Sequence, residues 1–211
     1  MTCSRRMLAR WLSITAAVSL LLGSATPSWP DTFSPLFDSE FKAATERWRP
    51  RTDWRWAKAQ GVQESGLRAD ICSPVGACGV MQIMAPTWAD IERAMGWPST
   101  SRFSAHHNIF GGVYYQARMD RVWDGRSRSE FQKRQLGYAG YNAGTGSILS
   151  AQTLCSGARL WLDIVPCLPQ VTGAPNARQT REYVRRIPNI FTEIVQACTW
   201  TGHRGGCAPV H

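Results

Sequence analysis

Apolar residues recur at intervals of three and four along most of the chain, which is the spacing of amphipathic helices. Leu36, Phe37, Phe41, Ala44 and Trp48 follow this spacing in the first such stretch. Strict alternation of apolar and polar residues, which would indicate strands, is rare. The pattern therefore predicts a mainly α fold. The predicted helices cover residues 36–48, 54–65, 87–95, 105–123, 130–141, 144–152 and 177–187, and the apolar pattern continues to residue 195.

Residues that begin or end helices stand at several of these boundaries. Ser129 and Gln132 form a capping box, in which each side chain bonds the backbone N–H of the other residue. Gly66 follows the second predicted helix, where a glycine can adopt the left-handed backbone that ends a helix. Asn176 is expected to cap the last helix, which is expected to run through Ile187, before Pro188.

The first 25 residues have the parts of a secretory signal peptide. A basic start that ends at Arg10 precedes an apolar run, 11–22, and small residues at 23–25 suit cleavage. The run is shorter than the roughly 20 apolar residues that cross a bilayer. We therefore expect an exported protein, periplasmic or secreted, with no stable membrane anchor after cleavage. An uncleaved anchor is the alternative.

The remaining length accommodates one domain. A chain of 211 residues with 44% hydrophobic residues can fill one core but is too short for two full domains. We expect a signal peptide at 1–25, an extended lead-in at 26–34, a single domain at 35–198 and a C-terminal tail at 199–211.

Cysteine usage agrees with export. Six cysteines remain once Cys3 leaves with the leader, and an even number in an exported protein favours disulfides. A zinc site is disfavoured because paired Cys-x-x-Cys spacing is missing. Six cysteines allow 15 pairings, and the sequence leaves this choice open. Local clustering favours three small loops, two of them in the irregular stretches 66–79 and 154–175. The favoured pairs are Cys72–Cys78, Cys155–Cys167 and Cys198–Cys207.

The formal charge of the whole chain is +9, and removing the three arginines of the leader leaves +6. Such a balance commonly indicates nucleic-acid binding. Here the arginines are scattered and no nucleic-acid motif organises them, so we expect no nucleic-acid partner. A basic exported protein is attracted to anionic cell-wall polymers, although scattered solvated charge explains the balance equally well.

Four short segments, far apart in the sequence, carry the candidate chemistry. The second to fourth segments bring amide, phenol and thioether groups, and the first brings a single glutamate, Glu64. This residue is near the C-terminus of a predicted helix, where the helix dipole disfavours a negative charge. A carboxylic acid kept protonated by apolar surroundings can protonate the leaving oxygen of a glycosidic bond. The segments are Gln63-Glu64-Ser65-Gly66, Gly79-Val80-Met81-Gln82-Ile83-Met84, Gly140-Tyr141-Asn142-Ala143-Gly144 and Glu182-Tyr183-Val184-Arg185-Arg186-Ile187.

In order and spacing, these segments resemble the catalytic domain of the soluble lytic transglycosylases (SLT), enzymes that cut peptidoglycan glycan strands. The family pattern is Glu-Ser, then Gly-Leu-Met-Gln, then Ala-Tyr-Asn, then a late Tyr, and the resemblance covers about residues 33–198. It implies a mainly α, lysozyme-like single domain of the goose-type lysozyme and SLT kind, here with irregular disulfide-bearing loops. It also implies peptidoglycan glycan strands as the partner, with no cofactor and no metal.

The resemblance implies a role for each motif residue. Glu64 is the expected catalytic residue, acting on the MurNAc-β-1,4-GlcNAc bond first as an acid and then as a base, so that a 1,6-anhydroMurNAc end forms. Tyr141 is expected to hydrogen-bond Glu64 or to hold it in place. Met81 and Met84 are expected to form an apolar wall, with core packing an equal alternative. The expected substrate-binding residues are Ser65, Met81, Gln82, Met84, Tyr141, Asn142 and Tyr183.

Three departures from the family pattern affect this interpretation. Gln179 stands where the family commonly has a glutamate, so no carboxylate acts there, and Val80 replaces the usual leucine. Cys72 and Cys78 flank the loop that precedes the glycine-valine-methionine-glutamine segment. We hypothesise that a disulfide between them stiffens this loop and thereby positions Gln82.

Two other functions remain open from the sequence. A goose-type-like muramidase would hydrolyse the same bond, with a residue such as Asp70 positioning water. A non-catalytic peptidoglycan-binding assembly factor would keep the fold without the reaction. His106 and His107 are adjacent but have no partners at ligand spacing, so a metal site is disfavoured. A secretion, conjugation or phage apparatus is a possible partner, and routine wall turnover is equally compatible.

Overall fold

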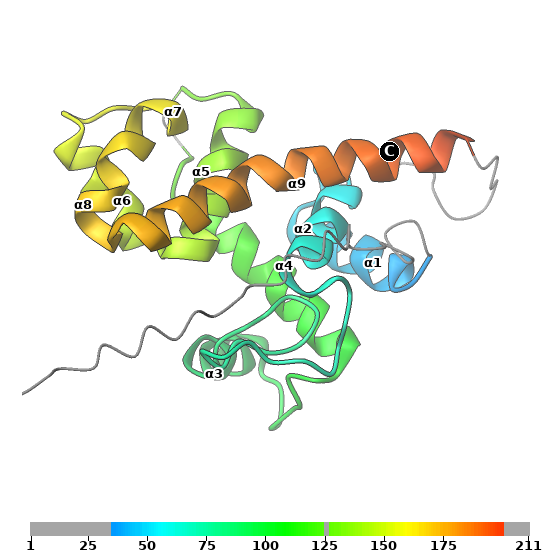
Figure 1. Cartoon of the computed structure of the whole chain (residues 1–211). Coiled ribbons are helices and arrows are strands. Elements are labelled where there is room, and N and C mark those ends of the chain that lie inside the picture. Colours follow the sequence, from blue (N-terminus) through cyan, green and yellow to red (C-terminus); the bar gives the residue numbers. More distant parts are fainter. Residues whose placement is uncertain (1–34, 125–126, 201–211) are drawn as a thin grey trace, which may run out of the picture.

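The computed structural model describes residues 35–124 and 127–200, which form a helical fold (Figure 1). No strand forms within these ranges, where β-pairing is limited to two isolated bridges that join Cys78 to Cys72 and to Ile83. The mainly α prediction is therefore confirmed. The helices are α1 (Asp38–Trp48), α2 (Arg55–Ser65), α3 (Ala85–Met95), α4 (Ala105–Arg121), α5 (Glu130–Ala143), α6 (Thr145–Leu154), α7 (Trp161–Ile164), the 3-10 helix η1 (Val165–Cys167), α8 (Leu168–Thr172) and α9 (Ala174–Trp200).

The long helix α9 crosses the molecule and packs against α8, α5 and α2 in turn (Figure 1). Trp56 of α2 and Phe191 of α9 stack with ring centroids 3.8 Å apart and an interplanar angle of 5°. Helix α4 packs against α1 and α5 on the other side of the core. The helices that carry three of the motifs, and the loop that carries Gly79–Met84, are thus held together by one core. Its largest fully buried side chains include Trp54, Trp123, Tyr138, Phe41, Met81, Ile91, Ile109 and Leu136.

The prediction that the last helix ends at Ile187 is wrong, because α9 runs on through Pro188 as one helix of 27 residues. A proline inside a helix removes one backbone hydrogen bond and crowds the preceding turn. The apolar stripe continues across it, since Ile187, Ile190 and Ile194 are all buried. Burial of this stripe against the core outweighs the local cost of the proline.

Two further boundaries differ from expectation. Asn176 does not cap α9 but lies in its first turn, where its side-chain amide donates to the Thr172 carbonyl oxygen of α8. The stretch 154–175 is not wholly irregular, because α7, η1 and α8 form there. These short helices bury Trp161, Ile164 and Leu168, whose packing was not visible as a long periodic pattern.

Several predictions fall on residues outside the described ranges. These are the signal peptide at 1–25, the lead-in at 26–34, nearly all of the tail at 199–211, and Cys207 of the third predicted disulfide. Among the helices of residues 35–124 and 127–200, none combines the length and the apolar character needed to cross a membrane.

Candidate active site

Glu64 lies in the last turn of α2, which Gly66 ends with a left-handed backbone (φ 63°). Its side chain is partly buried in the protein. Burial raises the pKa of Glu64 from an ordinary value of 4.5 to about 8, because a carboxylate loses solvation there, and a hydrogen bond from Tyr183 opposes this shift. The carboxyl group is therefore mainly protonated at neutral pH, the state that a general acid requires.

Tyr183 of α9 is the direct hydrogen-bond partner of Glu64. Its hydroxyl donates to Glu64 Oε1 at 2.5 Å and accepts from Gln60 Nε2 at 3.0 Å. Burial, followed by the nearby charge of Glu64, raises the pKa of Tyr183 well above its usual range, so the phenol keeps its proton. The sequence predicted Tyr183 as a substrate-binding residue, and the structure gives it a hydrogen bond to Glu64. Gln60, one helical turn before Glu64, was not predicted.

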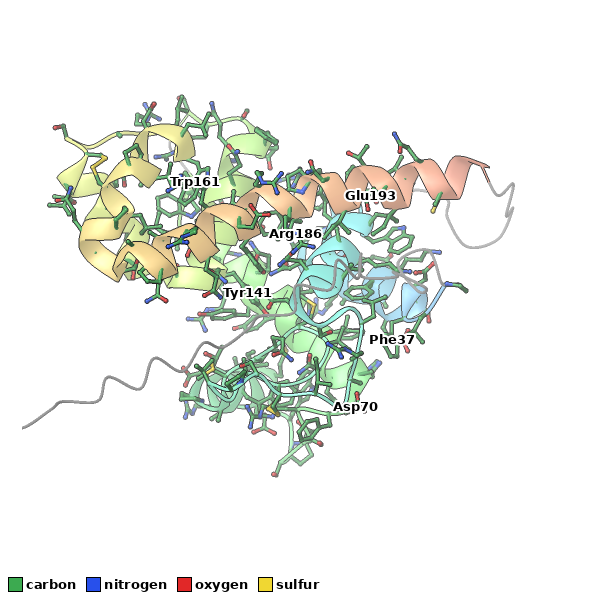
Figure 2. All side chains as sticks on the ribbon, viewed as in Figure 1. Phe37, Asp70, Tyr141, Trp161, Arg186 and Glu193 are labelled. Atoms are coloured by element: carbon green, nitrogen blue, oxygen red, sulfur yellow. A yellow bond between two sulfur atoms is a disulfide. The ribbon has the colours of Figure 1, made fainter. Side chains whose placement is uncertain are left out.

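Tyr141 of α5 lies below the middle of α9 in Figure 2, and its hydroxyl donates to the Met81 carbonyl oxygen at 2.8 Å. The expected hydrogen bond to Glu64 is therefore not the one that forms. Burial, and then the charge of Glu64, raises the pKa of Tyr141, so the two groups are still electrostatically coupled. Tyr141 ties α5 to the segment that carries Gln82.

The two methionines have different environments. Met81 is fully buried, whereas Met84 is 40% exposed. A Cβ at Gly112 of α4 would lie 2.5 Å from Met81 Cβ, and one at Gly61 of α2 would lie 3.4 Å from its sulfur. Helical glycines thus make the space that Met81 fills. For Met81 the core-packing alternative describes the structure, and Met84 remains exposed enough to contact a ligand.

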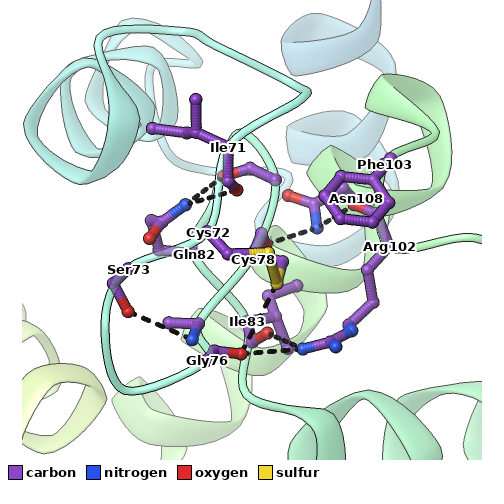
Figure 3. The surroundings of a disulfide bond; sticks show 12 residues. Ile71, Cys72, Ser73, Gly76, Cys78, Gln82, Ile83, Arg102, Phe103 and Asn108 are labelled. Atoms are coloured by element: carbon purple, nitrogen blue, oxygen red, sulfur yellow. Dashed lines mark hydrogen bonds between the residues drawn. A yellow bond between two sulfur atoms is a disulfide. The ribbon is translucent and has the colours of Figure 1, made fainter.

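Gln82 occupies a strained position in the same segment, with φ 45°. Its amide nitrogen donates to the carbonyl oxygens of Gly79 at 2.9 Å and Ile71 at 3.3 Å (Figure 3). These two bonds hold the side chain against the loop of residues 66–79. Both bonds use the amide nitrogen, so the amide oxygen is the end of Gln82 that can accept from an external donor.

Asn108 of α4 fixes the backbone of this segment, and sequence reasoning did not find it. The side chain is fully buried. Its oxygen accepts from the Met81 N–H at 2.7 Å, and its nitrogen donates to the carbonyl oxygens of Cys78 at 3.1 Å and Arg102 at 2.8 Å (Figure 3). The only signal in the sequence was an asparagine directly before the apolar residue Ile109.

Ser65 is turned into the protein. Its hydroxyl donates to the Val80 carbonyl oxygen at 2.8 Å and accepts from the Arg68 N–H at 3.1 Å, and the side chain is buried. The hydrogen bond to Val80 joins the end of α2 to the Gln82 segment.

Asn142 follows Tyr141 on α5 and is partly exposed. Its amide oxygen accepts from the hydroxyl of Thr180 on α9 at 2.8 Å, and Thr180 is buried. Because the oxygen is held in this way, the amide nitrogen is the end of Asn142 that is oriented away from Thr180. Gln179, where the family commonly has a glutamate, is exposed.

Within residues 35–124 and 127–200, the favoured disulfides Cys72–Cys78 and Cys155–Cys167 are both present. The first closes the loop between α2 and the Gln82 segment (Figure 3). The guanidinium of Arg102 braces the same loop from outside, donating to the carbonyl oxygens of Gly76 at 2.9 Å and Ile83 at 3.1 Å.

No cluster of three metal-ligating side chains occurs in the described part of the chain. His107 instead shares a hydrogen bond with Ser104 at 2.9 Å and packs edge-on against Trp97. A pocket of about 550 Å³ opens near these rings between α1, α3 and α4, and none of the motif residues lines it.

The fold is of the lysozyme-like class. It matches the 70 kDa soluble lytic transglycosylase of Escherichia coli with a TM-score of 0.62 and 24% identity, over 81% of this chain and 25% of that one. The lytic transglycosylase Slt of Pseudomonas aeruginosa, in an inactive mutant, matches with a TM-score of 0.62 and 24% identity, over 79% of this chain and 25% of that one. The expected fold is thereby confirmed.

Residues 41–158 match the sequence model of the family described as the transglycosylase SLT domain, and the chain belongs to this family. Membrane-bound lytic murein transglycosylase F of Hahella chejuensis is 28% identical over 181 residues, which are 84% of this chain and 30% of that protein. The namesake from Pseudomonas putida is 30% identical over 151 residues, 70% of this chain and 29% of that protein. The chain spans about a third or less of the curated relatives it matches.

Proposed function

We propose that the protein is a peptidoglycan lytic transglycosylase in which Glu64 serves as the acid and then as the base. The observation that carries this proposal is a partly buried carboxyl group with a pKa of about 8, bonded to a buried tyrosine, in an SLT domain. Relatives named lytic murein transglycosylases support the same substrate, and their names support an exported location.

The reaction needs one proton donor and no added water. Glu64 protonates the oxygen that links MurNAc to GlcNAc, and the bond between this oxygen and C1 of MurNAc breaks. The N-acetyl oxygen of the same sugar stabilises the positive C1. The Glu64 carboxylate then removes the proton from the C6 hydroxyl as O6 bonds to C1, which closes the anhydro ring and returns Glu64 to its acid form. Because O6 belongs to the same sugar, little entropy is lost in bringing it to C1.

A single carboxyl group suffices for this sequence of steps, whereas glycosidases that use water or a covalent intermediate pair two. In the described part of the chain, burial and Tyr183 determine the pKa of Glu64, and no second carboxylate contributes. Asp70, the candidate for positioning water in a muramidase, is exposed in the loop after α2. The site therefore favours the intramolecular reaction over hydrolysis.

The other motif residues divide into two groups in this proposal. The Gln82 amide oxygen, the Asn142 amide nitrogen and the exposed Met84 side chain are the groups that contact the sugar. Ser65 and Tyr141 hold the Gln82 segment in place through the carbonyl oxygens of Val80 and Met81.

Mass spectrometry of digested peptidoglycan tests the proposal. We expect muropeptides with 1,6-anhydroMurNAc ends, each lighter by one water molecule than its hydrolysed counterpart. Reducing MurNAc ends would instead identify a muramidase. If the peptidoglycan is not digested, a non-catalytic assembly factor would be the only candidate function that remains.

The Cys72–Cys78 disulfide is expected to support activity as well as stability. Replacing both cysteines by serine should lower the free energy of unfolding by about 2 kcal/mol, because the unfolded chain is no longer constrained. It should also lower kcat, since the loop that holds Gln82 is released. Chemical denaturation and turnover of purified cell walls measure the two effects.

The Cys155–Cys167 disulfide provides the matched control, because it joins the region between α6 and α8. Its removal should cost about 3 kcal/mol of stability and leave kcat unchanged. Equal kcat values for both double-serine variants would remove the role that we assign to the Cys72–Cys78 bond.

A further inference from the structure

A line of hydrogen bonds continues from Glu64 into the core, past the tyrosine that bonds it. The Tyr183 hydroxyl accepts from Gln60 Nε2 at 3.0 Å, and the same nitrogen donates to Gln116 Oε1 of α4 at 3.0 Å. Gln116 Nε2 then donates to Asp120 Oδ1 at 2.8 Å. Both glutamines are fully buried. The proposed acid is thereby connected to a carboxylate on a different helix.

Asp120 forms an ion pair with Arg49, which lies just after α1. The guanidinium contacts Asp120 Oδ2 at 2.8 Å, and the Arg49 side chain is buried. Burial alone would lower the pKa of Arg49, but the charge of Asp120 raises it overall, so this arginine stays charged. The titratable groups of α5 that face the pair are Tyr138 and Arg134. Each Asp120 oxygen thus faces a donor, Oδ2 the Arg49 guanidinium and Oδ1 the Gln116 amide nitrogen.

The acceptor at Asp120 Oδ1 sets the direction of every hydrogen bond in the line. Gln116 must turn its nitrogen toward the carboxylate, which leaves its oxygen facing Gln60. Gln60 must therefore turn its own nitrogen toward Gln116, and this nitrogen also reaches the Tyr183 hydroxyl. Reversing either amide would bring two acceptor oxygens together at hydrogen-bond distance. Since Gln60 occupies a lone pair of the hydroxyl, the Tyr183 hydrogen points to Glu64 Oε1.

The direction of the Tyr183 bond decides which oxygen of Glu64 carries the acid proton. An oxygen that already accepts the tyrosine hydrogen is the carbonyl-like oxygen of the protonated acid. We propose that Gln60, Gln116 and Asp120 are positioning residues that orient the Tyr183 hydroxyl and thereby keep the transferable proton of Glu64 on Oε2. This inference rests on the proposed function, because it assigns the oxygen that protonates the glycosidic bond.

Gly137 of helix α5 leaves room for the hydrogen-bonded side chains of Gln116 and Asp120. A Cβ at Gly137 would lie 2.0 Å from Asp120 Oδ1 and 2.8 Å from Gln116 Nε2. Any side chain at this position would displace the two groups that set the direction of the bonds. A buried polar line is costly unless its members are paired, and here the Gln60 oxygen is buried without a hydrogen-bond partner.

Gln116→Met tests the inference, since it keeps a side chain of similar length and removes the bonds to both neighbours. Gln60 is then free to reverse and accept the Tyr183 hydrogen, and Glu64 loses a bond that lowers its pKa. We expect kcat to fall about tenfold with KM unchanged, as for an interaction that acts on the transition state. The alkaline limb of the pH profile should move up by about one pH unit, the effect of losing one charge-assisted hydrogen bond.

Gln152→Met is the matched control, because Gln152 is also a buried glutamine and donates to the Ala158 carbonyl oxygen at 2.7 Å, away from the line. It should lower thermal stability without moving kcat or the alkaline limb. Gln60→Met should act in the same direction as Gln116→Met. In a Tyr183→Phe background, Gln116→Met should move the limb no further, since the line acts through this hydroxyl.

The outcomes separate this inference from the proposed function. Loss of anhydro products in the wild type would overturn the proposed function. An active wild type, with folded Gln116→Met and Gln60→Met variants that keep its kcat and alkaline limb, would overturn only the positioning role. If neither variant folds, NMR of the wild type decides. A protected Tyr183 hydroxyl proton close to the Gln60 amide hydrogens supports the role, and a freely exchanging one contradicts it.

Discussion

Glu64→Gln is expected to lose lytic activity by about a thousandfold, the contribution of a positioned general acid and base. Glutamine keeps the size of the side chain and can still accept the Tyr183 hydrogen bond, but it cannot release a proton at any accessible pH. Clearing of purified cell walls measures the loss. Unchanged clearing by a folded Glu64→Gln variant would end the assignment of Glu64 as the catalytic residue.

The same variant is expected to be more stable than the wild type at alkaline pH. Because the pKa of Glu64 is raised in the folded state, from 4.5 to about 8, the folded protein binds more protons than the unfolded chain between these values. The wild type therefore loses stability as the pH rises through this window, whereas glutamine does not titrate. The advantage of Glu64→Gln should grow to about 2 kcal/mol by about pH 8, after allowance for partial exposure.

Glu193→Gln is the control for both effects. Glu193 is an exposed glutamate on the outer face of α9 (Figure 2). Its replacement should change neither wall clearing nor the dependence of stability on pH. Thermal unfolding of the three proteins across the same pH series makes the comparison.

Asn108→Asp is expected to lower the free energy of unfolding by about 3 kcal/mol. An aspartate keeps the acceptor for the Met81 N–H but turns the donor into a second oxygen, which would face the carbonyl oxygens of Cys78 and Arg102. The new group is fully buried, so its charge is neither solvated nor paired. Urea denaturation measures the change in the free energy of unfolding.

The loss should extend to activity. Met81 and Gln82 share one backbone segment, and release of the Met81 N–H lets this segment move relative to Glu64. Asn176→Asp is the matched control, because Asn176 is exposed and its side chain makes one bond, to the Thr172 carbonyl oxygen. A stability within about 0.5 kcal/mol of the wild type for Asn108→Asp, the range of ordinary surface changes, would contradict the role of Asn108.

Local chemistry explains which helices could be predicted. The capping box of Ser129 and Gln132 forms, and Gly66 ends α2, because each depends on residues within one turn. Pro188 was misjudged because its effect is decided by the burial of α9 against residues far away in sequence. The short helices α7 and α8 are too brief to show a period.

The residues of the candidate site also differ in how far the sequence could predict their contacts. The sequence placed Glu64 and Tyr183 in the site through their motifs, and the structure joins them by a hydrogen bond. The sequence did not show that the hydroxyls of Ser65 and Tyr141 form hydrogen bonds inside the protein. Their partners are backbone carbonyl oxygens, which no side-chain pattern marks. Asn108 was missed for the same reason.

Titration of the Glu64 side chain by NMR, with carbon-13 glutamate and the Glu64→Gln variant for assignment, tests the central claim most directly. The account predicts that the Glu64 carboxyl carbon titrates with a pKa of about 8 in the folded protein. A pKa near the ordinary value of 4.5 would mean that Glu64 is charged at neutral pH, and it would contradict the proposed role as the acid.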